Sequence, residues 1–180
     1  MGRQHIVAVI FASCLLTVRG VATELSPDQW QFDAKDVHPA TSVRLTLRAQ
    51  HEVKGWLSSG RPVLTIQCKS GTAASYVEAG VALEVTQVDQ QVVRVRFDDL
   101  EFHPERWREV GNWTISSRHP DRLIEQLLRS QRFTLEFTPF GSAPVQADFA
   151  VQGLAQFSAP LATACGTHAP GKGAAPQRDP

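Results

Sequence analysis

The densest group of chemically reactive side chains in this sequence is a run of acids between residues 98 and 109. Carboxylates gathered in this way can act as general acid and base, or bind calcium. Arginines alternate with these acids, which favours a solvated surface of paired charges over a catalytic or metal site. The acids are Asp98, Asp99, Glu101, Glu105 and Glu109, and the arginines beside them are Arg94, Arg96, Arg106 and Arg108.

The other catalytic patterns are incomplete or missing from the sequence. A nucleophile elbow needs glycine two residues before its serine, and Trp56 occupies that position before Ser58. There is no phosphate-binding glycine loop and no zinc-protease helix motif. The six histidines are scattered and mostly lie beside turns, as is typical of exposed loop residues. We therefore expect no catalytic residue, no metal site and no cofactor.

Residues 1–22 are typical of an export signal. Arg3 gives the positive start, an apolar run covers residues 6–18, and Gly20-Val21-Ala22 offers the small residues that a signal peptidase recognises. Cys14 lies within this segment, and the apolar run continues beyond it. We therefore expect Cys14 to be removed with the signal rather than to carry a lipid anchor. The mature chain is then periplasmic or secreted, without a transmembrane span.

The two cysteines that follow the signal are Cys68 and Cys165. An even pair in a chain bound for an oxidising compartment is most simply explained by one disulfide, which would close a span of 97 residues. Two free buried thiols are the alternative. Zinc binding is disfavoured, because neither cysteine has a second cysteine or a histidine at ligand spacing.

The composition describes one folded domain with an extension at each end. Eighteen basic and eighteen acidic residues balance to zero in 180 residues, which excludes the positive surface of a non-specific nucleic-acid binder. Cleavage after residue 22 would remove two arginines and no acid, leaving a net charge of −2. Residues 166–180 hold three glycines, three prolines and no large apolar side chain, which predicts a disordered tail. The domain is expected over residues 23–165.

Apolar and polar residues alternate through most of that domain, as in half-buried strands. Leucine and isoleucine instead fall at helical spacing over 120–130, and a closing helix is expected over 154–165. About seven strands with two short helices predict a mainly β fold, either sandwich-like or α+β. The predicted strands cover 42–49, 62–69, 74–78, 92–98, 107–116, 132–138 and 144–151, with turns at 70–71 and 139–142.

Trp56 follows a glycine between two predicted strands. An aromatic side chain there can form a platform on a binding loop, or it can fill the open end of a β core, which is the commoner use. We favour the second interpretation. Trp56, Arg94 and Arg96 are the candidate interaction residues.

The C-terminal part of the domain carries a recognisable pattern. It consists of Arg132–Phe149 (RFTLEFTPFGSAPVQADF), Gly153-Leu154, Pro160-Leu161 and Cys165. This pattern, with weaker matches upstream, resembles the type VI secretion-associated VasI/TagO-like family of exported bacterial proteins over most of residues 41–165. The resemblance implies a bacterial, β-rich accessory protein with a Cys68–Cys165 bond, and it supplies no catalytic residues.

Two functional hypotheses follow from these observations. The first is an exported, non-enzymatic protein of the cell envelope that acts by binding another protein, with a place in type VI secretion. The second is a hydrolase of cell-wall or glycan material that uses two acids from residues 98–109, with one carboxyl kept protonated opposite a charged base.

Overall fold

The computed structural model describes residues 29–37, 40–84 and 89–165. The predicted signal at residues 1–22 and the predicted tail at 166–180 lie outside the described residues. The described helices are α1 (Pro120–Arg129), the 3-10 helix η1 (Leu154–Phe157) and α2 (Ser158–Cys165). The described strands are β1 (Gln31–Val37), β2 (Ala40–Arg48), β3 (Val53–Lys54), β4 (Ser59–Gly60), β5 (Val63–Lys69), β6 (Thr72–Glu78), β7 (Gln90–Phe97), β8 (His103–Val110), β9 (Thr114–Ser116), β10 (Arg132–Phe137) and β11 (Val145–Ala150).

Nine of these strands form one antiparallel sheet in the order β1-β2-β5-β6-β9-β8-β7-β10-β11, and β3 pairs with β4 as a separate hairpin. Two short α-helices and the bond between Cys68 and Cys165 complete the described domain. The prediction of a mainly β fold with two short helices and one intradomain disulfide is confirmed.

The pairing register gives the sheet one buried face. Residues directly opposite each other in an antiparallel pair point to the same side, so Leu45 opposite Ile66, and Val95 opposite Leu135, face one core. All four of these side chains are almost fully buried. The largest fully buried side chains of this core are Trp107, Phe133, Phe137 and Phe149.

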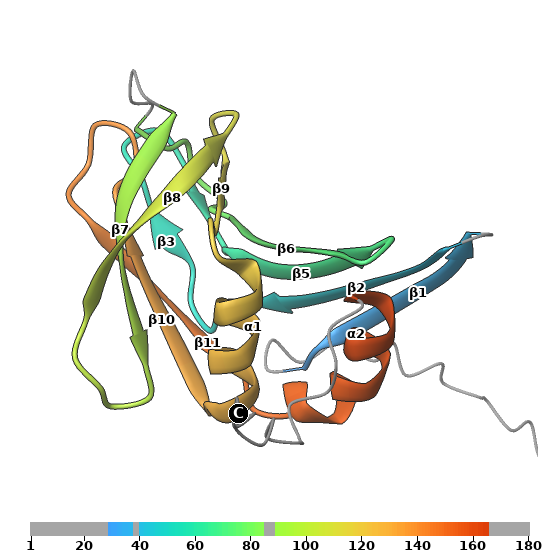
Figure 1. The fold of residues 1–180 in the computed structure, drawn as a ribbon. Coiled ribbons are helices and arrows are strands. Elements are labelled where there is room, and N and C mark those ends of the chain that lie inside the picture. Colours follow the sequence, from blue (N-terminus) through green and yellow to red (C-terminus); the bar gives the residue numbers. More distant parts are fainter. Residues whose placement is uncertain (1–28, 38–39, 85–88, 166–180) are drawn as a thin grey trace, which may run out of the picture.

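The sheet curls until its two distant parts meet (Figure 1). The amide of Gln50, just after β2, donates to the carbonyl oxygen of Asp148 in β11 at 2.7 Å. Helix α1 packs against β6, and α2 packs against β2 and β5. Leu123, Ile124 and Leu127 are the buried residues of α1, at the spacing expected of its apolar side. The curled sheet and its two helices therefore enclose one core.

The disulfide fastens α2 to the sheet. Cys68 lies on the inner face of β5 and Cys165 is in the last turn of α2, with their Cα atoms 4.9 Å apart. Beside this bond, the amide of Gly71 donates to the carbonyl oxygen of Ala164 at 3.1 Å. Both cysteines are buried. The alternative of two free thiols is wrong.

The structure differs from the sequence prediction in three places. Strand β1 and the β3–β4 hairpin were not predicted, because their short or mixed sequences carry little alternation. Residues 107–116 form two strands rather than one, because Gly111 turns the chain with a φ of 64°. Trp113 lies in this turn and is 51% exposed.

The β3–β4 hairpin is held against the sheet by a contact between two glycines. A Cβ atom added to Gly60 would lie 2.1 Å from the carbonyl oxygen of Gly80. No such atom fits without movement of the backbone. The absence of a side chain at Gly60 therefore permits the close approach of the hairpin that carries Trp56 to the backbone of Gly80.

We predict that Gly60→Ala lowers the free energy of unfolding by more than the matched variant Gly71→Ala. Gly71 has a φ of +78° but nothing within 4 Å of an added Cβ, so its variant carries only conformational strain of about 1–2 kcal/mol. Urea unfolding of both variants measures the difference. Equal losses would contradict the tight Gly60–Gly80 contact.

Candidate functional site

Large apolar side chains are exposed together at one end of the sheet. Trp56, Leu57 and Phe140 are 69%, 74% and 48% exposed, and the rings of Trp56 and Phe140 lie 6.4 Å apart. We call these three residues the aromatic end. The interpretation of Trp56 as a plug of the core is wrong, because its side chain is mostly exposed and is not part of the buried core. Adjacent exposed apolar side chains are typical of interaction sites.

The aromatic end is built from two loops that the sheet holds in place. Trp56 and Leu57 lie in the β3–β4 loop, which is closed by a bond from the Gly55 amide to the Ser58 carbonyl oxygen at 2.8 Å. Phe140 lies in the β10–β11 loop, and its amide donates to the carbonyl oxygen of Ala82 at 2.9 Å. The Trp56 ring covers Gly141, where an added Cβ would contact it at 3.5 Å.

The β8–β9 turn is a third loop at this end of the sheet, and it contacts the segment 79–83. The Ala79 and Leu83 amides donate to the carbonyl oxygens of Trp113 and Asn112, both at 2.8 Å, so the β8–β9 turn lies beside the same segment. Figure 1 shows the β8–β9 turn and the β10–β11 loop at the same end of the sheet. Trp113, in the β8–β9 turn, is half exposed.

The hollow within the aromatic end is very small. It has a volume of about 10 Å³ between Trp56, Leu57, Phe140 and the backbone beside them. That is room for about one water molecule. The aromatic end is therefore suited to contact with another surface rather than to enclosing a small molecule.

Arg94 and Arg96 are fixed on the outer face of β7. Both guanidinium groups lie over the Phe102 ring, at 4.8 and 4.5 Å from its centroid. Arg94 also pairs with Glu136 at 3.0 Å, and Arg96 donates to the Thr134 hydroxyl at 3.4 Å. The ion pair of Arg94 joins β7 to β10 and does not involve the acids next to it in the sequence.

The structure does not bring Arg96 to Trp56. The Gln91 side chain donates to the Thr138 carbonyl oxygen at 3.0 Å, so β7 begins at the aromatic end. Arg96 lies five residues further along β7 than Gln91. At the usual rise per residue, the backbones of these two residues are about 16 Å apart. Trp56 therefore lies away from the other two candidate interaction residues. Arg94 and Arg96 both pack on the Phe102 ring.

Glu136 on β10 is an acid whose pKa the fold lowers. A hydrogen bond from the Gln146 amide at 3.0 Å, and then the hydrogen bond and charge of Arg94, lower the pKa of Glu136 below its usual value near 4.5, against the opposing effect of burial. Glu136 thereby joins β7, β10 and β11 through its two carboxylate oxygens.

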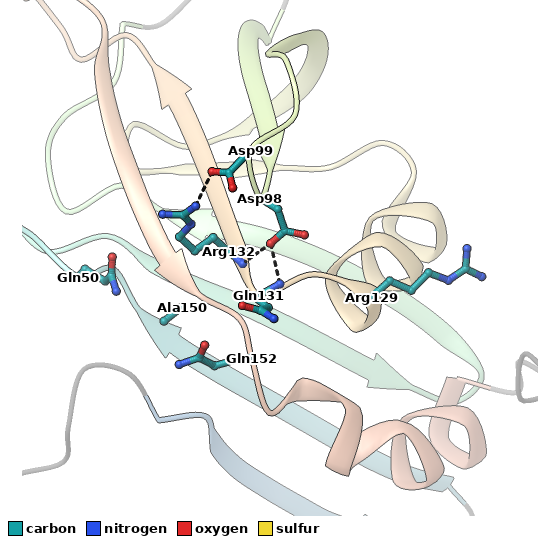
Figure 2. A pocket seen from close by; sticks show the side chains of 8 residues that line it. All are labelled: Gln50, Asp98, Asp99, Arg129, Gln131, Arg132, Ala150 and Gln152. Carbon is teal, nitrogen blue, oxygen red and sulfur yellow. Dashed lines mark hydrogen bonds and ion pairs between the residues drawn. The ribbon is translucent and has the colours of Figure 1, made fainter.

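A polar pocket of about 540 Å³ lies at the opposite end of β7 (Figure 2). Asp98 adopts a left-handed φ of 50°, and one of its oxygens accepts the Gln131 and Arg132 amides at 2.8 and 2.9 Å. Figure 2 also shows Asp99 facing Arg132, which it contacts at 2.6 Å. The lining residues are Gln50, Asp98, Asp99, Arg129, Gln131, Arg132, Ala150 and Gln152.

The acids of residues 98–109 are not gathered in this pocket. Asp98 and Asp99 line it, whereas Glu105 accepts the Trp107 indole N–H at 2.9 Å on β8. Glu109 is buried four residues further along that strand, about 13 Å from Glu105. Glycoside hydrolysis needs two carboxyl groups about 5–10 Å apart across the scissile bond. The carboxylate of Asp98 instead supports the start of β10.

No cluster of three or more histidines, cysteines and acids is placed to hold a metal ion in the part of the chain that the structure describes. Neither described α-helix combines the length and the apolar character that crossing a bilayer requires.

The fold is similar to a solved bacterial structure. The crystal structure of invasion-associated protein B from Bartonella henselae matches with a TM-score of 0.52 and 11% identity, covering 73% of this chain and 89% of that chain. At this identity the similarity concerns the fold. No protein-family model and no curated protein matches the sequence.

We predict that Glu136→Gln lowers stability in a pH-dependent way. Because folding lowers the pKa of Glu136, its charge stabilises the protein above pH 4.5, and this contribution disappears as the pH falls through the lower, folded-state pKa. Above pH 4.5 we expect the unfolding free energy of the variant to be lower than that of the wild type by up to about 1 kcal/mol. We expect this difference to shrink as the pH falls.

Urea unfolding between pH 3 and 7 measures this loss, at about one-unit steps across the pKa of an ordinary glutamate. Glu125→Gln, at an exposed position on α1, serves as the matched control for removal of one negative charge. A loss of the same size at every pH, or one shared by the control, would contradict the role of the Glu136 carboxylate.

Proposed function

We propose that this protein is exported to the bacterial envelope and acts there, without catalysis, by docking its aromatic end onto another protein. Three observations support export: the signal-like residues 1–22, the Cys68–Cys165 disulfide, and a fold similar to that of invasion-associated protein B. Structural disulfides persist in oxidising compartments such as the periplasm.

The exposure of Trp56, Leu57 and Phe140 carries the proposal of protein binding. Tryptophan and phenylalanine are enriched at protein interfaces, and tryptophan is among the residues whose truncation costs most binding energy. The hydrogen bonds that close the two loops reduce the freedom that binding would otherwise remove. The small volume of the hollow favours a protein surface over a small ligand.

The arrangement of the acids favours binding over hydrolysis. The Asp98 carboxylate accepts hydrogen bonds from two backbone amides, and the Asp99 carboxylate pairs with Arg132. The Glu105 carboxylate accepts the Trp107 indole N–H. We place the partner in the envelope, and the resemblance to the VasI/TagO-like family supports a partner from a type VI secretion system. That part of the proposal rests on the sequence pattern between residues 132 and 165.

We predict that Trp56→Ala with Phe140→Ala abolishes recovery of a partner from envelope extract. Truncation of an interface tryptophan typically costs about 2 kcal/mol or more, which corresponds to at least about a thirtyfold loss of affinity. The measurement is affinity capture with the disulfide-bonded protein, followed by mass spectrometry. Leu100→Ala is the matched control, because Leu100 is equally exposed, at 65%, on the β7–β8 loop.

Equal capture by the wild type and the double variant, at unchanged melting temperature, would contradict docking through the aromatic end. A captured envelope protein outside any secretion system would contradict only the type VI part. Release of glycan fragments from cell-wall material, lost in Asp99→Asn, would overturn the non-enzymatic part.

A further inference from the structure

We propose that Arg108, Ser116, Ser117 and Arg118 form a binding site for an oxyanion, namely a phosphate or sulfate group. These four residues line a pocket of about 330 Å³ on the outer side of β8 and β9. The site is separate from the loops of the aromatic end and does not depend on the function proposed for it.

The strand register directs two of these side chains outward together. Arg108 lies directly opposite Ser116 in the β8–β9 pair, so both point to the same face of the sheet. Their neighbours Trp107 and Ile115 point the other way and are fully buried. The backbone that carries Arg108 and Ser116 is therefore fixed by the core.

Ser117 and Arg118 follow directly after β9, in a segment that is also fixed. The Ser117 amide donates to the Ser75 carbonyl oxygen at 2.9 Å, and the Ser117 hydroxyl oxygen accepts the His119 amide at 3.2 Å. The hydroxyl proton of Ser117 therefore remains available to donate to a bound oxygen. The Ser116 hydroxyl makes only a long bond, at 3.4 Å, to Ser75.

The positive charge of the pocket is not neutralised by the described residues. Both arginines are exposed, and neither makes an ion pair in the part of the chain that the structure describes. Arg44, Arg94, Arg122 and Arg132, in contrast, each lie within 4 Å of an acid. Asp121, the acid nearest to Arg118 in the sequence, does not line the pocket.

These groups together match the chemistry of a tetrahedral oxyanion. Arginine presents a planar fork of N–H donors that fits two oxygens of one phosphate or sulfate, and two serine hydroxyls can reach the others. A single such group does not fill 330 Å³, so the remaining space accommodates whatever carries it. The carrier is either a soluble molecule or the headgroup of an anionic lipid.

Titration of the full disulfide-bonded chain with inorganic phosphate, followed by amide chemical shifts, tests the site. We expect saturable shifts at residues 116–118 and about a tenfold weaker affinity in Arg108→Gln and in Arg118→Gln, as expected for loss of a charge-assisted hydrogen bond. Arg48→Gln is the control, because Arg48 is also exposed and is not ion-paired among the described residues.

Absence of saturable shifts, or an equal loss of affinity in Arg48→Gln, would overturn the proposal. Sedimentation with vesicles of phosphatidylglycerol, compared with phosphatidylcholine, then distinguishes the two carriers. Binding to the anionic vesicles that is lost in Arg108→Gln assigns a lipid headgroup. Phosphate binding without vesicle binding assigns a soluble phosphate.

Discussion

The structure depends on one constraint, which is that a single nine-stranded sheet must bury most of one face. The sheet satisfies this constraint by curling until Gln50, after β2, bonds to Asp148 in β11. Helices α1 and α2 cover the sides that the curl leaves open, and the Cys68–Cys165 bond keeps α2 in place.

The same constraint leaves the loops and the outer face free for other uses. Outward side chains of the strands contribute little to the core, so arginines can occupy many of these positions. Arg94 and Arg96 are ordered there by the Phe102 ring and by partners on β10, whereas Arg108 and Arg118 make no ion pair with the residues that the structure describes. At one end of the sheet, two loops held by backbone hydrogen bonds expose Trp56 and Phe140.

Much of the sheet could be predicted from the sequence, because burial of one face imposes alternation. Strands β2, β5, β7, β10 and β11 follow the pattern closely, and the Ser70-Gly71 turn has the two positive φ values of a tight hairpin. The helical spacing of Leu123 and Leu127 likewise reflects burial of one side of α1. Two cysteines in a chain with a signal-like start were sufficient to predict the disulfide.

The candidate sites were harder to predict, because they depend on which segments meet. The exposure of Trp56 results from the approach of the β3–β4 loop to the β10–β11 loop, more than eighty residues later, and no local pattern contains that approach. The pairing of Arg94 with Glu136 is likewise set by the β7–β10 register rather than by the neighbouring acids. Gly111 was the local signal that 107–116 divides into two strands.

The central claim is that the aromatic end is the surface that contacts a partner protein. Photo-cross-linking from a reactive residue placed at position 56 in the exported protein tests this claim most directly, with the same residue at position 100 as the control. The account predicts one dominant cross-linked product from position 56 and none from position 100. The same products from both positions, or none from position 56 in cells where the protein is folded and exported, would contradict it.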